Sequence, residues 1–167
     1  LAMYPDELNE LYRRQAEWTC AFADRAIDLG IDMIHISDDW GSQKDMMFNP
    51  EIWREIIKPH LRKVIDHVHS RGALCSLHSD GCISKVTDEL AEIGIDLLHP
   101  WQESANMSYD VYFEKYQEKQ PDVIFLAKNT VDNRKKFFEE NDFGQWIAEN
   151  YDIEHMEETP YLCVITK

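Results

Sequence analysis

Three segments of this chain share one pattern. A helix-like stretch ends at a glycine, a short apolar run follows, and the run ends in polar residues that can donate or accept protons. The segments are residues 30–39, 72–80 and 94–103. Glycine suits the left-handed turn that ends a helix, and a short apolar run suits a strand buried on both faces. Each segment therefore predicts a helix, a turn, a parallel strand and a loop, which is the repeating unit of β/α folds.

This repetition predicts an α/β fold of the TIM-type (β/α) barrel class. A closed barrel of eight units typically needs about 250 residues, and the chain has 167, so we expect a partial barrel of about four units. We place it at residues 1–127, with the apolar run 123–127 as the fourth strand, and expect a diverged tail at 128–167. The motif Gly-Ile-Asp-x-x-His occurs at 30–35 and again at 94–99, which supports stacked repeats.

Apolar spacing predicts the helices between these strands. Residues 6–29 show a helical period of apolar side chains that we expect to pack against the sheet: Leu8, Leu11, Tyr12, Trp18, Phe22, Ala26 and Leu29. Asn49 and Pro50 form a typical helix start, and Pro59 predicts a kink further along that helix. A helix is also expected at 83–93, and another after Ser108.

The loops that follow the predicted strands contain the candidate catalytic residues. In β/α folds these loops open on one side of the sheet, where ligands bind, so we expect the polar clusters to share one pocket. Asp38 and Asp39 follow the first strand directly, and neighbouring side chains on an extended segment point in opposite directions. At most one of the two should face the pocket. The predicted catalytic residues are Asp38, Asp39, His78 and Asp80.

His78 and Asp80 also form a candidate metal site. They lie two positions apart, which places both on the same side of an extended segment. A catalytic zinc needs three protein ligands, and the third is left open among Cys82, His35, His99 and Asp38. The alternative is that His78 bonds Asp80 or a backbone carbonyl and only shapes the loop.

Four residues are candidates for binding a small-molecule substrate: Trp40, Gln43, His99 and Gln102. The two glutamine amides can both donate and accept hydrogen bonds. Gly41, between Trp40 and Gln43, would let the backbone turn close to a ligand. The alternative is that the residues of this loop have only a structural role.

Charge and cysteine placement exclude some partners. The net charge of -15 repels the phosphates of nucleic acids and anionic membrane surfaces, so we expect neither as a partner. The four cysteines are scattered and form no Cys-x-x-Cys pair, which indicates reduced thiols and a cytoplasmic location. No apolar run approaches the roughly 18 residues of a membrane span.

Taken in order, a set of short motifs resembles the uroporphyrinogen decarboxylase (URO-D) family. The motifs are Asp38–Gln43, Asn49-Pro50-Glu51 with Trp53, Lys58-Pro59-His60, His69–Gly72, Leu77–Gly81, Gly94 with Asp96, and Pro100 with Gln102. The resemblance implies a β/α barrel and relatives of two kinds. One kind decarboxylates the acetate side chains of a porphyrinogen, and the other consists of zinc-dependent methyltransferases that move methyl groups between a corrinoid and a thiol.

The chain departs from the family pattern at the zinc motif and near its end. The methyltransferases carry His-x-Cys after a barrel strand, whereas this chain has His78 followed by Asp80. The usual Gly-Gly-x-Asp strand end is replaced by Lys128-Asn129-Thr130. These differences indicate a partial or diverged member.

Electrostatics favours methyl transfer over decarboxylation. A porphyrinogen with eight carboxylates needs basic residues around it, but the predicted loops are mainly acidic, with Lys44 the nearest cation. We therefore expect a metal-assisted one-carbon transfer that uses zinc, with a corrinoid as co-substrate and a corrinoid protein as a partner. Two alternatives stay open: decarboxylation of uroporphyrinogen, and a non-catalytic fragment or accessory subunit that completes a barrel with a second barrel half.

Overall fold

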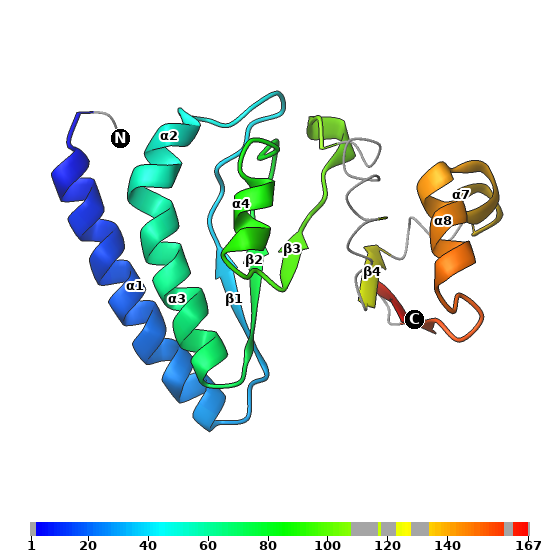
Figure 1. The fold of residues 1–167 in the computed structure, drawn as a ribbon, viewed down its shortest axis with the longest axis horizontal. Helices are drawn as coiled ribbons and strands as arrows, with labels where there is room; N and C mark the ends of the chain where they lie inside the picture. The colour runs from blue at the N-terminus through cyan, green and yellow to red at the C-terminus, as the bar shows by residue number, and fades with distance from the viewer. Residues whose placement is uncertain (1–2, 108–116, 118–122, 128–133, 159–161, 167) are drawn as a thin grey trace. The chain divides into compact units, whose positions relative to one another are not determined.

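The computed structural model describes residues 3–107, 117, 123–127, 134–158 and 162–166 (Figure 1). The chain divides into two compact units, Leu1–Ser108 and Tyr109–Lys167. The sequence placed this division at residue 127, at the end of the fourth expected strand. The structure places it earlier because that strand pairs within the second unit.

The first unit contains three parallel strands, each preceded by a helix. In sheet order they are β1 (Met33–Ser37), β2 (Leu74–His78) and β3 (Leu97–His99). The preceding helices are α1 (Pro5–Asp28), α3 (Lys58–Ser70) and α4 (Thr87–Glu92). The glycines between helix and strand, Gly30, Gly72 and Gly94, have φ of 90°, 78° and 94°. All three units predicted from the repeated pattern are therefore confirmed, although α4 begins later than the expected residue 83.

The helix expected from Pro50 begins there but is irregular. Asn49 caps it by accepting a hydrogen bond from the Glu51 amide. A short α2 (Pro50–Ile52) leads into a π-helical segment η1 (Trp53–Ile57), which continues directly into α3. Pro59 lies in the first turn of α3. Since Pro59 has no amide hydrogen, the change in hydrogen-bond pattern occurs just before it.

The core of the first unit lies between the helices and one face of the sheet. Ile34, Cys75 and Leu77 point from the strands into this core and are at most 3% exposed. The expected apolar residues of η1 and α3 meet them there: Trp53, Ile56, Ile57, Leu61, Val64, Ile65 and Val68 are all buried. Because side chains alternate along a strand, the residues between the core residues lie on the opposite face.

Helix α1 packs beside α3 (Figure 1). The expected face of α1 is confirmed only in part, since Tyr12 and Ala26 pack against the core. Its buried residues are the small side chains Ala16, Cys20 and Ala23. Small side chains let two helix backbones approach closely. Helix α1 therefore buries this face and leaves the larger apolar residues exposed. Four residues expected in the core are exposed by more than half: Leu11, Trp18, Phe22 and Leu29.

The second unit has an antiparallel sheet. Strand β4 (Val123–Ala127) forms where expected, but it pairs antiparallel with β6 (Leu162–Thr166), which also pairs with β5 (Glu157–Glu158). The prediction of a fourth parallel unit was therefore wrong. An apolar run shows that a strand forms but not which partner supplies its hydrogen bonds.

Two helices, α7 (Arg134–Glu140) and α8 (Asp142–Asn150), complete the described part of the second unit. They share a core of their own, formed by Phe138, Phe143, Trp146, Ile147 and Tyr151. The helix expected directly after Ser108 lies outside the described residues. None of the described helices is long and apolar enough to span a bilayer.

Candidate metal centre

A cluster of three histidines lies on the face of the first sheet that is opposite the helices. Each parallel strand contributes one: His35 from β1, His78 from β2 and His99 from β3. The ring centroids of His35 and His99 are 5.1 Å apart and stacked, and the His78 ring meets the His99 ring edge-on at 5.1 Å. Ser76, also on this face, is hydrogen-bonded to Nδ1 of His35 at 3.0 Å. The strand register, which pairs His78 with His99 and His35 with Ser76, produces this cluster.

Asp39, His78 and Asp80 form a compact group at the carboxyl ends of β1 and β2. One ligand atom from each lies within 4.8 Å of the others. The His78 Nε2 atom is 3.5 Å from Oδ1 of Asp39 and 3.7 Å from Oδ2 of Asp80. Both carboxylates are exposed by more than half, whereas the His78 side chain is 26% exposed. The structure thus brings His78 and Asp80 together, and the residue that joins them is Asp39, which was expected to be catalytic.

These distances fit a metal ion. Tetrahedral zinc with bonds of about 2.0–2.2 Å places neighbouring ligand atoms roughly 3.3 Å apart. The two distances from His78 exceed that value by a few tenths of an ångström. The donors are two carboxylate oxygens and one imidazole nitrogen, a set that suits zinc and manganese.

The two loops that carry this group are in backbone contact. A Cβ atom placed on Gly41 would lie 2.5 Å from the Asp80 carbonyl oxygen, and one on Gly81 would lie 2.5 Å from the Gly41 carbonyl carbon. The Cys82 amide donates to the Ser42 carbonyl at 2.8 Å. Gly41 was expected to allow close approach of a ligand, but its close neighbour is the Asp80–Cys82 backbone.

Two hydrogen bonds hold the turn that carries Asp80. The Asp80 amide donates to Oδ1 of Asp39 at 3.0 Å, and the Gly81 amide donates to Oε1 of Gln102 at 2.7 Å. Gln102, expected to bind substrate, therefore holds the turn next to Asp80.

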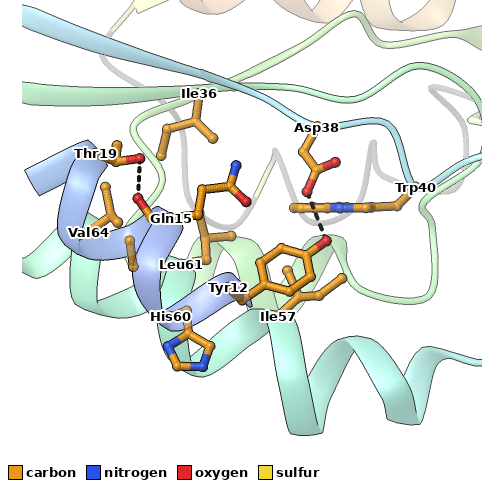
Figure 2. A pocket seen from close by; sticks show the side chains of 11 residues that line it. Tyr12, Gln15, Thr19, Ile36, Asp38, Trp40, Ile57, His60, Leu61 and Val64 are labelled. Carbon is orange, nitrogen blue, oxygen red and sulfur yellow. Dashed lines mark hydrogen bonds between the residues drawn. The ribbon is translucent and has the colours of Figure 1, made fainter. Parts of the chain in front are cut away.

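Asp38 points to the other side of the sheet. It lies with Tyr12 and Trp40 in a small cavity of about 50 Å³ between β1, α1 and α3 (Figure 2). The Tyr12 hydroxyl donates to the Asp38 carboxylate at 3.4 Å. Burial, and then the charge of Asp38, raise the pKa of Tyr12 to about 12. The expected opposition of Asp38 and Asp39 is confirmed, and Asp39 is the one that faces His78.

The remaining predicted residues occupy different surroundings. Trp40 is 1% exposed and packs edge-on against Trp53 at 5.6 Å, so it is a core residue. Gln43 is exposed on the loop after β1. Cys82, a candidate third ligand, is 3% exposed, and its sulfur lies 3.3 Å from the Ser84 hydroxyl. Neither Trp40 nor Cys82 joins the ligand group.

The rings of His99 and His35 contact the His78 ring, but neither residue belongs to the group of Asp39, His78 and Asp80. Burial, and then the neighbouring rings of His35 and His78, lower the pKa of His99. A neutral imidazole can accept a proton or a hydrogen bond. His35 was named from the sequence only as a possible ligand, but the Gly-Ile-Asp-x-x-His repeat signals its position, because the repeated histidines are the two that stack.

The first unit is a parallel β/α structure with polar residues gathered at the carboxyl ends of neighbouring strands, where proteins of this class bind their ligands. Within this class, the family model of uroporphyrinogen decarboxylase (URO-D) matches residues 1–112. The chain therefore belongs to the URO-D family, as a partial member. The family has the TIM-barrel fold. No curated protein and no solved structure matches the chain.

Proposed function

We propose that this protein assists methyl transfer between a corrinoid and a thiol, with a divalent metal held by Asp39, His78 and Asp80. The observation that carries the proposal is the convergence of these three ligand atoms within 4.8 Å. When bound, such a metal lowers the pKa of a thiol and so provides a thiolate at neutral pH. We propose further that the three β/α units form part of a barrel whose inner face carries the histidines.

The residues around the group would position the reactants. Asp39 and Asp80 supply negative charge that balances a divalent cation, and His78 is the only basic side chain within 4.0 Å of either carboxylate in the described part of the chain. Gln102 can donate from its amide, and neutral His99 offers an acceptor beside His78. In the reaction the thiolate attacks the methyl carbon. A C–S bond forms, the Co–C bond breaks, and its electron pair stays on cobalt.

An assay with methylcobalamin and a small thiol tests this proposal. We expect loss of the methylcobalamin absorbance in the presence of zinc or manganese, dependent on the protein. His78→Ala should abolish the protein-dependent rate. The matched control is His155→Ala, which removes an exposed histidine of the second unit and should leave the rate unchanged. Equal rates for the wild type and His78→Ala would overturn the proposal.

Decarboxylation of uroporphyrinogen is the second candidate, and the three histidines are the observation that favours it. Protonated imidazoles would supply the donors that a carboxylate-rich substrate needs. The lowered pKa of His99 opposes this, since it favours the uncharged ring at neutral pH. Mass spectrometry of uroporphyrinogen incubated with the protein distinguishes the candidates. Only a decarboxylase lowers the mass of the substrate in steps of about 44 Da, the mass of one carbon dioxide.

A further inference from the structure

A second candidate site lies on the helix side of β1, away from the candidate metal centre. It is the cavity that contains Asp38, and its walls come from β1, α1, η1, α3 and the loop after β1, all within the first unit (Figure 2). Its volume is about 50 Å³, whereas one buried water needs roughly 10–15 Å³. The cavity therefore has room for a molecule of about three or four non-hydrogen atoms.

Among the described residues, no cationic side chain pairs with the Asp38 carboxylate at one end of this cavity. The Asp38 side chain is partly buried, and its hydrogen bond from the Tyr12 hydroxyl is long, at 3.4 Å. Arg13, which follows Tyr12 on α1, is paired with carboxylates of its own helix. Burial, and then the charges of two basic neighbours, lower the pKa of His60, which lies in the cavity wall. A partly buried charge is costly unless a cation balances it, so the cavity favours a positively charged occupant.

Two aromatic rings share this end of the cavity. Tyr12 and Trp40 line it together with Asp38 (Figure 2), and Trp40 is held edge-on against Trp53 at 5.6 Å. Ring faces attract ammonium groups, and the attraction grows when the group is removed from water. Because the pKa of Tyr12 is raised to about 12, its hydroxyl stays protonated and uncharged at neutral pH. The carboxylate and the two rings together therefore suit an organic ammonium group.

The other end of the cavity has an aliphatic wall. Its residues come from β1 and α3: Ile36, Leu61 and Val64 (Figure 2). An inorganic cation would gain nothing from this wall, since such ions are bound by several oxygen ligands, whereas a short hydrocarbon chain gains free energy by leaving water. We propose that this cavity binds a short-chain alkylammonium ion of about two or three carbons, with its ammonium group at Asp38 and its chain along the aliphatic wall. The site is independent of the metal centre, because Asp39, and not Asp38, faces His78.

Binding of ethylammonium to the full chain tests the proposal. Isothermal titration calorimetry should show saturable binding of one ethylammonium per chain, and sodium chloride at the same ionic strength should show none. Asp38→Asn removes the charge at nearly constant shape and should raise the dissociation constant at least about tenfold. Asp39→Asn is the matched control: this neighbouring carboxylate faces His78 on the other side of the sheet, so the variant should bind ethylammonium as the wild type does. Circular dichroism checks that both variants are folded.

The selectivity of the wild type tests the two ends of the cavity separately. Ethanol matches ethylammonium in size but has no charge, and ammonium has the charge but no hydrocarbon chain. Both should therefore bind at least about tenfold more weakly than ethylammonium. A wild type without saturable ethylammonium binding, or an Asp38→Asn variant that binds equally well, would overturn the proposal. Ethanol or ammonium that bound as tightly as ethylammonium would also overturn it, and this comparison needs no variant to fold.

Discussion

Gly41 and Gly81 let two loops touch at the backbone, and this contact places Asp39 beside His78 and Asp80. Gly81 has a φ of 76°, and a Cβ atom there would meet the Gly41 carbonyl carbon at 2.5 Å and the carbonyl oxygens of Gly41 and Ser42 at 2.7 Å. Backbone atoms cannot turn aside as a flexible side chain can. The geometry of the candidate metal centre therefore depends on Gly41 and Gly81 having no side chain.

Gly81→Ala should destabilise the protein much more than Gly72→Ala. The two glycines have nearly the same φ, 76° and 78°, but nothing lies within 4 Å of a Cβ on Gly72. Gly72→Ala should cost about 1 kcal/mol of unfolding free energy from backbone strain alone. Gly81→Ala adds the clash and should cost at least about 3 kcal/mol. Urea denaturation measures both, and equal losses would contradict the described loop contact.

Gln102 should affect metal affinity without being a ligand. Its Oε1 holds the Gly81 amide next to Asp80, and residues that orient metal ligands typically contribute about 10–100-fold to affinity. Gln102→Ala should therefore weaken zinc binding about tenfold in a calorimetric titration, while Gln43→Ala, on the exposed loop, should not. The reverse order of effects would argue that Gln43 and not Gln102 supports the site.

At the scale of elements, the repeated Gly-Ile-Asp-x-x-His motif explains how two strands place their histidines together. In both copies the glycine ends a helix and the histidine lies five residues later on the same face of the sheet. Strand β2 lies between β1 and β3 and contributes His78. The second copy has a further role, because Asp96 accepts hydrogen bonds from His69 Nε2 at 2.8 Å and the Cys75 amide at 2.7 Å. This carboxylate links the end of α3 to β2 and the start of β3.

Helix α4 is fastened to the preceding helical segment by Glu89. Its carboxylate accepts from Arg54 Nε at 2.6 Å and from Lys58 Nζ at 2.5 Å, and its side chain is 18% exposed. Burial acts to raise the pKa of Glu89, but the hydrogen bonds from Lys58 and Arg54 outweigh it, so the pKa is lowered from 4.5. Because the folded pKa lies below the unfolded one, this stabilisation is present above pH 4.5 and is lost as the pH falls through the folded value.

Glu89→Gln should therefore lower the unfolding free energy by about 1–2 kcal/mol at pH 7. The difference from the wild type should shrink as the pH falls below 4.5, where the wild-type carboxylate also loses its charge. Denaturant titrations at several pH values measure this. Glu92→Gln changes an exposed residue of the same helix and should leave the unfolding free energy equal to that of the wild type at every pH. A Glu89→Gln deficit that persisted unchanged at acidic pH would show that charge is not its cause.

Individual helices and strands were predictable from the sequence, but the elements against which they pair or pack were less predictable. The strand at 123–127 and the helix start at Asn49 are local properties of spacing and capping, and both are confirmed. The antiparallel pairing of β4 with β6 joins segments far apart in the chain, and no local pattern encodes it. The buried face of α1 was predicted only in part for a related reason: a helical period shows that a face exists, while the choice between small and large side chains depends on α3.

The candidate site was predictable to a similar degree. His78 with Asp80 follows from a spacing of two on one strand end, and the structure confirms that they lie together. The choice of Asp39 over Asp38 depends on which way the strand end turns. The sequence limited that choice to one of the two residues without selecting it. The support from Gln102 depends on the arrangement of three loops in space.

At the scale of the whole molecule, the chain contains two units with separate hydrophobic cores. The first is built around Trp53, Ile65 and Leu77, and the second around Ile147, which is 0% exposed. The URO-D match at residues 1–112 covers the first unit and ends just beyond it. The candidate metal centre belongs entirely to this first unit.

Separate cores predict separate responses to a cavity. Ile147→Ala should destabilise the second unit by about 2–4 kcal/mol, a typical cost for deleting a buried isoleucine side chain. Hydrogen exchange should accelerate at amides of α8, whereas those of β2 should keep their protection. Val68→Ala, in the first core, should give the opposite pattern. An equal loss of protection in both units would contradict two independent cores.

We propose that Asp39, His78 and Asp80 bind one metal ion, and titration with cobalt(II) tests this binding. Cobalt(II) bound by three protein ligands and a water in a tetrahedral site has characteristic visible absorption, and zinc should displace it. We expect one equivalent per chain in the wild type and His155→Ala. His78→Ala and Asp39→Asn should weaken binding by more than about 100-fold. A wild type that binds no cobalt or zinc, or a His78→Ala variant that binds as well as the wild type, would contradict a metal site formed by these three residues.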